Sequence, residues 1–330
     1  MVVLCRALGQ DWTWTNAEAC VTDVINVLQT SKQYSDFPPV VSNFVWCFVF
    51  ATACFLLQVV TGNYSFVDRL WSLSPVFYAW NYIVVAWLRG LEFDVRLVVV
   101  VMLITQWGVR LTYNFYRKGG YVLTSEDYRW EFTRLHFIKN WFLWQVFALV
   151  FIAFYQNFLL YLITCPLQVV FKVWENKFKS DIYDNWTWLD SGLALAFAGF
   201  LILETIADQE QWNFQGNKWK MLKKGKKLQE LPYPYSLGFV TTGTFAYSRH
   251  PNFFAEQAMW WVVYFFSVSA SGYQNWTILG TILLTLLFQG STRYTEHITL
   301  TKYSNYAKYQ QAVSMLLPLP PSKNPAPKKD

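Results

Sequence analysis

The chain of 330 residues is rich in apolar and aromatic side chains, at 54% and 20%, and only 15% of its residues are charged. Soluble globular domains carry about 25% charged residues, so this composition excludes an ordinary soluble domain and indicates several membrane spans. The net charge of +6 is modest, and in a membrane protein it is typical of basic cytoplasmic loops rather than of nucleic-acid binding.

The first 39 residues are expected to form an interfacial segment and not a signal peptide. Their first apolar run is short, and Asp11 and Glu18 follow it. Capping residues at Thr15 and Asn16 then precede apolar positions that repeat at helical spacing from Val21 onwards. This pattern predicts a short amphipathic helix that lies against the membrane or the bundle.

Long apolar stretches follow along most of the chain. A helix needs about 20 mostly apolar residues to cross the hydrocarbon of a bilayer. Pro166 is expected to kink or end the fourth stretch, so the predicted count is about seven and ranges from six to eight. The fold class predicted is all-α, a polytopic membrane helix bundle over 40–315 as a single domain. The predicted spans are 40–61, 72–89, 95–114, 141–164, 189–207, 255–271 and 276–290.

The connections differ in charge. Basic residues crowd the segments 114–140 and 208–254 and the C-terminal tail, whereas the connection 271–276 has no charge. Basic loops favour the cytoplasmic side, so these three segments are predicted to share it. Residues 316–330 are rich in Pro and Lys, a composition typical of a disordered tail.

Ionisable side chains at the edges of the predicted spans form five clusters, and such groups are functional candidates. The predicted topology brings all five to the cytosolic face, where several arginines would match phosphate oxygens. The clusters are Asp68 and Arg69; Arg110, Asn114 and Arg117; Glu126, Asp127 and Arg129; Glu204 and Asp208; and "YSRHPNFFAEQ" (247–257), followed downstream by Arg293, Glu296 and His297.

Each cluster also has a purely structural interpretation. Asp68 and Arg69 would anchor the interface, Arg110 and Arg117 would reach the headgroups, and Pro251 would begin a helix. Lys223 to Lys227 are interpreted as a solvated surface near anionic lipid. The five cysteines and three histidines lack the spacing of a metal site, so no metal is expected.

Five motifs occur in the order found in the DUF1295 family, which the chain resembles from about residue 60 to 320. DUF1295 lies within the steroid 5-alpha-reductase-like superfamily. "GTFAYSRHPNFFAE" resembles G-x-x-x-Y-S-R-H-P-N-Y-F-G-E, and "ETIADQEQWNF" resembles E-x-x-A-D-x-Q-x-x-x-F. The other three are "RLTYNFYR", "EDYRW" and "KYSNYAKYQQAVSMLLPLP". Phe253, Ala255 and His297 depart from the family pattern, as does Ser125 in the acidic loop motif.

The resemblance implies a helix bundle like those of steroid 5-alpha-reductases and isoprenylcysteine methyltransferases. It also implies that the C-terminal half of this chain (about 189–315) binds NADPH from the cytosol. It places Asp208, Asn252 and Glu256 at the cofactor, and a carboxyl and a tyrosine at a substrate carbonyl. Asp68, Tyr113 and Glu126 are the candidates for that catalytic pair. The full predicted cofactor set, from the clusters and the motifs, is Arg110, Asn114, Arg117, Asp127, Arg129, Glu204, Asp208, Tyr247, Arg249, His250, Pro251, Asn252, Glu256, Arg293, Glu296 and Tyr306.

The function expected is that of an NADPH-dependent reductase, which reduces a C=C bond of a lipid or sterol-like enone in the membrane. No GxGxxG occurs, so a Rossmann domain is not expected to carry the cofactor. Two alternatives stay open. One is an S-adenosylmethionine-dependent lipid or prenylcysteine methyltransferase, whose family shares the R-H-P motif, and the other is a non-enzymatic lipid binder. The expected location is the endoplasmic reticulum membrane, with the bilayer and a hydrophobic small molecule as partners and with no nucleic acid or obligate protein partner.

Overall fold

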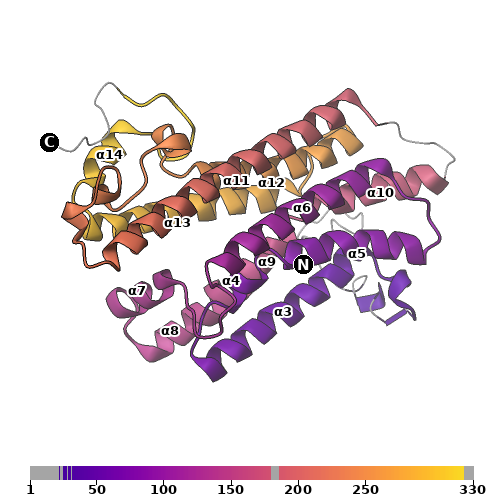
Figure 1. The fold of residues 1–330 in the computed structure, drawn as a ribbon. Helices are drawn as coiled ribbons and strands as arrows, with labels where there is room; N and C mark the ends of the chain where they lie inside the picture. The colour runs from indigo at the N-terminus through magenta and orange to yellow at the C-terminus, as the bar shows by residue number, and fades with distance from the viewer. Residues whose placement is uncertain (1–21, 23–24, 28, 31, 180–185, 323–330) are drawn as a thin grey trace. The chain divides into compact units, whose positions relative to one another are not determined.

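The structure, a computed structural model, describes residues 22, 25–27, 29–30, 32–179 and 186–322. All regular elements in these ranges are helical (Figure 1). Most of the predicted N-terminal amphipathic helix and the last residues of the predicted tail, 323–330, lie outside the described residues.

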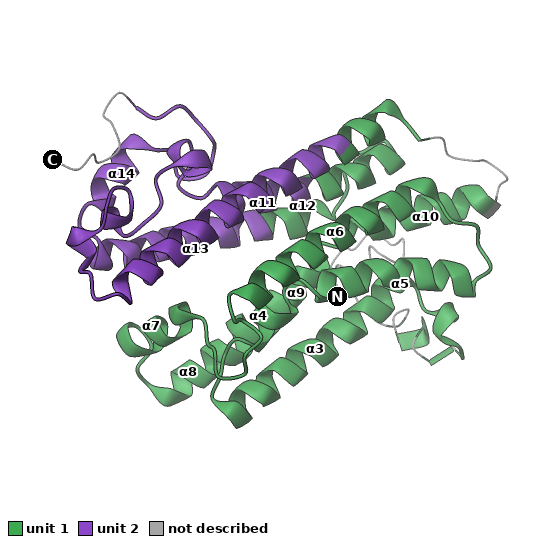
Figure 2. Cartoon of the chain, in the orientation of Figure 1, with its two compact units in different colours: residues 1–194, 262–283 green, residues 195–261, 284–330 purple. Residues whose placement is uncertain are grey.

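The chain divides into two compact units, which Figure 2 shows in different colours. Unit 1 comprises residues 1–194 and 262–283, and unit 2 comprises 195–261 and 284–330. This division is finer than the single bundle domain expected from the sequence. The boundaries fall within three helices, α11 (Trp188–Leu222), α12 (Pro251–Ser271) and α13 (Ile278–Lys302).

Unit 1 is built from a bundle of helices. Its long helix α3 packs against α9 and the π-helical segment η3, and α5 packs against α6. Its elements before α11 are η2 (Tyr34–Asp36), α3 (Pro39–Thr61), α4 (Phe66–Leu70), α5 (Ser74–Leu88), α6 (Val95–Arg117), α7 (Tyr128–His136), α8 (Trp141–Phe147), η3 (Ala148–Tyr155), α9 (Gln156–Leu162) and α10 (Pro166–Lys179).

Close helix packing in unit 1 depends on small and paired residues. A Cβ atom on Gly108 of α6 would lie 2.3 Å from Cγ2 of Val76 and 2.8 Å from the carbonyl oxygen of Ser72, so only glycine allows α5 to approach this closely. At the other end of α6, the buried Arg96 forms a bidentate ion pair with the buried Asp190 of α11, with both bonds at 2.8 Å.

Unit 2 joins parts of α11, α12 and α13 through short elements. These are η4 (Leu228–Glu230), η5 (Tyr235–Leu237), η6 (Gly243–Ala246) and α14 (Tyr306–Ala312). One core cluster contains Leu237, Phe239, Tyr306, Tyr309 and Val313. The connection 223–250 and the C-terminal segment therefore share an apolar core.

Within the described residues, four helical stretches are long and apolar enough to cross a membrane: Pro39–Thr61, Val95–Arg117, Trp141–Phe178 and Trp188–Leu222. The other three predicted spans also contain helices, α5, α12 and α13, but the expected count of about seven spans is not confirmed. The 15 residues of α5 reach about 22 Å, which is short for a bilayer core of about 30 Å. Polar side chains such as Glu256 in α12 and Gln289 and Arg293 in α13 lower the hydropathy of the other two.

Candidate functional site

A buried carboxylate, Glu296 on α13, is the centre of a polar cluster in unit 2. The Arg249 guanidinium donates to both of its oxygens, at 2.6 and 3.1 Å, and Nε2 of His250 lies 3.0 Å from Oε1. Two residues of α14 also donate hydrogen bonds to the Glu296 carboxylate, Tyr306 at 3.2 Å and Gln310 at 2.8 Å. Burial raises the pKa of Glu296, but the hydrogen bonds from His250 and Arg249 outweigh this effect and lower it to about 2.

The C-terminal segment holds the turn before α12 in place. The backbone N–H groups of Arg249 and His250 donate to the carbonyls of Ser314 and Met315, at 2.9 and 3.2 Å. The N–H of Leu319 donates in return to the carbonyl of Tyr247, at 3.0 Å. The turn that carries the R-H-P motif is therefore held by backbone hydrogen bonds to a segment about 65 residues further along the chain. Leu319 lies within the stretch that the sequence assigns to the tail.

A second pair of motif residues meets beside this turn. Pro251 begins α12, and Nδ2 of Asn252 donates to Oδ1 of Asp208 on α11 at 3.3 Å. Glu204 is buried one turn before Asp208. Glu256 is buried one turn after Asn252 and accepts a hydrogen bond from Trp260 Nε1 at 3.1 Å.

Glu210 of α11 fixes the start of the motif loop, a role that the sequence did not reveal. Its Oε2 accepts hydrogen bonds from the backbone N–H and the hydroxyl of Thr244, at 2.9 and 2.6 Å. A Cβ on Gly243 would lie 2.1 Å from Glu210 Oε1, and Gly243 has φ 64°. The positive φ favours glycine, and any side chain here would displace the Glu210 carboxylate from Thr244.

In unit 1, Arg69 folds the loop that carries the acidic motif. The buried Arg69 donates to the carbonyls of Gly120, Val122 and Ser125, at 3.1, 3.1 and 2.9 Å. Glu126 accepts from the backbone N–H of Tyr64 at 2.8 Å, which docks the same loop. These bonds account for the guanidinium of Arg69 without any ligand.

Asp68 in unit 1 lies close to the buried Trp130 and to a second carboxyl group, that of Asp127. It accepts a hydrogen bond from Trp130 Nε1 at 3.1 Å, and the neighbouring Asp127 pairs with Arg129 at 2.8 Å. Burial and the nearby carboxylate of Asp127 raise the pKa of Asp68. The surroundings of Asp68 thus favour its neutral form, and a carboxyl group of this kind suits proton transfer.

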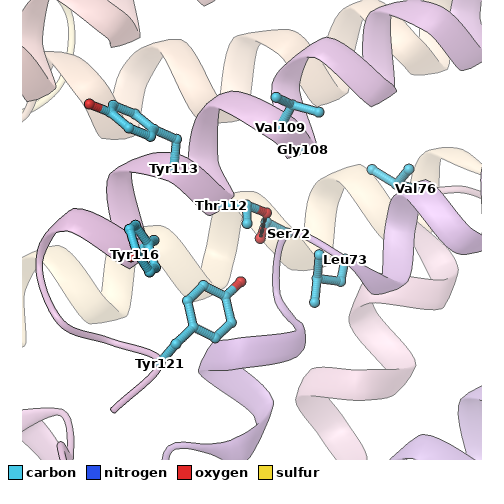
Figure 3. A pocket seen from close by; sticks show the side chains of 9 residues that line it. All are labelled: Ser72, Leu73, Val76, Gly108, Val109, Thr112, Tyr113, Tyr116 and Tyr121. Atoms are coloured by element: carbon cyan, nitrogen blue, oxygen red, sulfur yellow. Dashed lines mark hydrogen bonds between the residues drawn. The ribbon is translucent and has the colours of Figure 1, made fainter.

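The predicted site residues on α6 differ in their exposure. Asn114 is buried and accepts a hydrogen bond from Arg117 at 3.0 Å, and Arg110 is half-buried. Tyr113 is exposed and lines a groove of about 590 Å³ on unit 1 (Figure 3). The groove is almost entirely apolar, apart from a hydrogen bond of 2.7 Å between the hydroxyls of Ser72 and Thr112 and the hydroxyls of three tyrosines.

The structure thus gathers predicted site residues into separate groups. In unit 2 it joins Arg249, His250, Glu296 and Tyr306, and it joins Asp208 to Asn252. In unit 1 it places Asp68 beside Asp127 and Arg129. Arg293 and Tyr247 are exposed. The prediction that all five clusters reach the cytosolic face involves both units and stays a prediction. Among the described residues, no three His, Cys, Asp or Glu side chains gather as metal ligands.

These features define a helical protein with spans suited to a membrane and a buried polar cluster built from separated motifs. The family described as "Protein of unknown function (DUF1295)" matches residues 54–313, and the chain belongs to this family. It is 34% identical over 310 residues to the uncharacterized protein C594.04c of Schizosaccharomyces pombe. The matched region covers 89% of this chain and 85% of the relative. No solved structure matches the chain.

Proposed function

We propose that this protein is a membrane-embedded reductase of the steroid 5-alpha-reductase-like type. It would use NADPH to reduce a carbon–carbon double bond conjugated to a carbonyl in a lipid or sterol-like molecule, in the endoplasmic reticulum membrane. One observation carries the proposal. Four stretches that contain predicted cofactor residues, near residues 208, 250, 296 and 306, form two hydrogen-bonded groups in unit 2.

The role of Arg249 in this proposal is to position its neighbours. Its guanidinium is engaged by Glu296 and by the carbonyls of Gln310 and Val313. It therefore holds the turn so that Asn252, at the first turn of α12, and Asp208 present their side chains together. An asparagine–aspartate pair offers both donors and acceptors, which suits the amide and the ribose hydroxyls of a dinucleotide.

The apolar substrate fits unit 1. The groove beside Tyr113 has a volume in the range of small-molecule sites, about 300–1,000 Å³, and its lining suits a lipid-like molecule. When bound, NADPH would supply a hydride to the β-carbon of the enone. The product then also gains a proton at the α-carbon, so one NADPH is oxidised for each double bond. Asp68 is the candidate to hold a proton towards the carbonyl oxygen, because its environment favours the neutral form.

Ligand-induced stabilisation tests the cofactor assignment. The purified protein in detergent is heated with NADPH, NADH or S-adenosylmethionine while unfolding is followed. At about a hundred times its dissociation constant a ligand adds roughly 2.7 kcal/mol of stability. We expect a shift with NADPH that Asn252→Ala removes and that the exposed Asn213→Ala leaves intact. A shift with S-adenosylmethionine alone would identify a methyltransferase, and no shift with any of the three would favour a lipid binder.

A further inference from the structure

Unit 2 contains a buried lysine that the proposed chemistry does not use. Lys218, near the end of α11, is 3% exposed. Lysine is almost never this deeply buried unless it is paired. Its ammonium donates one hydrogen bond, to the carbonyl of Gly238 at 2.8 Å. No ion pair joins Lys218 to a carboxylate of the described residues, so this part of the chain supplies no counter-ion for its charge.

Aromatic rings surround this ammonium. Its nitrogen lies 5.8, 5.6 and 5.8 Å from the ring centroids of Phe214, Trp219 and Tyr303. Contacts near the 6 Å limit stabilise a cation only modestly, and an ammonium has three N–H donors, of which Gly238 takes one. The rings shape the site, and they do not replace an anion.

The backbone at Gly238 is built for this contact. Gly238 has φ 86°, and a Cβ there would lie 2.2 Å from the ring of Tyr303. Any side chain would push Tyr303 away from Lys218, so glycine allows the carbonyl and the ring to close on the same ammonium.

A second positive charge lies nearby. Lys302, which precedes Tyr303, is exposed and close enough to Lys218 for the two like charges to repel each other. The adjoining chain adds only more positive charge, because no acidic residue occurs between Glu210 and Glu230. The exposed lysines of this stretch are Lys220, Lys223, Lys224, Lys226 and Lys227. The positive charges of Lys218 and Lys302 and the basic residues around them favour the binding of an anionic ligand.

We propose that the corner formed by Lys218, Gly238, Lys302 and Tyr303 binds a phosphate group. Lysine binds phosphate as a point charge, and the exposed ring of Trp219 offers a flat face for a purine. This assignment rests on the proposed function. The bound group would then be the 2′-phosphate on the adenosine ribose, which NADPH has and NADH lacks. The same chemistry would hold the headgroup of an acidic phospholipid.

Nucleotide fragments separate these sources. Affinities of the full-length protein, in nanodiscs of uncharged lipid, are measured for NADPH, NADH, adenosine 2′,5′-bisphosphate and adenosine 5′-monophosphate. The variants are Lys218→Gln and Lys302→Gln, with Lys308→Gln on the exposed side of α14 as the control. Lys302→Gln changes an exposed residue, so the test survives if Lys218→Gln fails to fold. A parallel series replaces part of the lipid with phosphatidylserine and follows thermal stability.

We expect both variants to weaken NADPH and the bisphosphate about tenfold or more, the loss of one charged hydrogen bond, and to leave NADH and the monophosphate within about twofold. If the variants remove only a stabilisation by phosphatidylserine, the site holds a lipid headgroup and the nucleotide assignment is overturned. If no affinity and no lipid effect depends on either lysine, the corner is structural and the proposal fails. If the bisphosphate binds through these lysines but neither dinucleotide binds, the corner stands and the proposed function fails.

Discussion

Arg249 and Glu296 are 47 residues apart in the sequence and form a bidentate ion pair, with Nε to Oε1 at 2.6 Å and Nη2 to Oε2 at 3.1 Å. Both side chains are nearly buried, at 9% and 6% exposure. The pair ties the turn before α12 to α13, and the carbonyls of Gln310 and Val313 extend it to the C-terminal segment. The motif with the most hydrogen-bonding capacity in the sequence is therefore a structural junction as well as a candidate cofactor site.

Breaking this pair on one side should destabilise the protein strongly. Glu296→Leu leaves the guanidinium buried without its carboxylate, which costs about 3–5 kcal/mol. Arg249→Met leaves the Glu296 carboxylate buried without its guanidinium, at a similar cost. In the double variant neither charge is left alone, so its loss should be well below the sum of the two single losses. Denaturant unfolding in detergent measures all three, and strictly additive losses would show that the two charges do not depend on each other.

The raised pKa of Asp68 predicts a particular pH dependence. The folded state holds the proton of Asp68 more tightly than the unfolded chain does, so stability from this group is full at low pH and is lost as the pH rises through the folded pKa. Asp68→Asn removes the titration and still offers an oxygen to Trp130. The variant should therefore gain stability relative to the wild type as the pH rises above the unfolded-state pKa of about 4.

Asp36 is the matched control for this pH series. Its backbone hydrogen bonds from Gln33 and Lys32 lower its pKa, so its contribution is present at neutral pH and is lost on acidification. The difference between Asp36→Asn and the wild type should therefore run in the opposite direction and be small. A flat difference for Asp68→Asn would contradict the environment assigned to Asp68.

Ser248 should be sensitive although it has no charge. Its side chain is fully buried and donates to the carbonyl of Leu316 at 2.7 Å, which ties the turn to the C-terminal segment. Ser248→Ala leaves that carbonyl without this donor, at a cost of about 1–3 kcal/mol. The exposed Ser304→Ala should have little effect. Equal melting temperatures for the two variants would show that this bond does not hold the turn.

Gly108 should tolerate no larger residue. An added methyl group would overlap Val76 and the carbonyl of Ser72, so Gly108→Ala should force α5 and α6 apart at a cost of about 1–3 kcal/mol. Gly199 on α11 has open space at the same position, and Gly199→Ala should be neutral or stabilising. Thermal unfolding of the two variants compares them directly, and a tolerated Gly108→Ala would contradict the observed helix approach.

Some of this architecture was visible in the sequence. Apolar runs predicted helices that the structure contains, and the resemblance singled out Arg249, His250 and Glu296 before their contact was known. The span count was less predictable, because apolar content does not fix whether a helix such as α5 is long enough to cross.

Other features leave no pattern in the sequence. Arg69 bonds to backbone carbonyls, which every residue carries, so no residue type reveals its partners. The contact between Glu210 and Thr244 joins residues 34 apart without a repeated spacing. The surroundings of the Lys218 ammonium likewise depend on which segments of the chain pack around it, such as the segment that contains Gly238.

The most direct test of the reductase proposal follows the hydride. The protein in nanodiscs containing a total lipid extract is incubated with NADPH deuterated at the nicotinamide C4 position, and the lipids are analysed by mass spectrometry. The account predicts a lipid that gains one deuterium and one hydrogen across a former double bond, at a rate that Asn252→Ala reduces and Asn213→Ala does not. Transfer of a labelled methyl group from S-adenosylmethionine to a lipid, with no deuterium transfer, would contradict it.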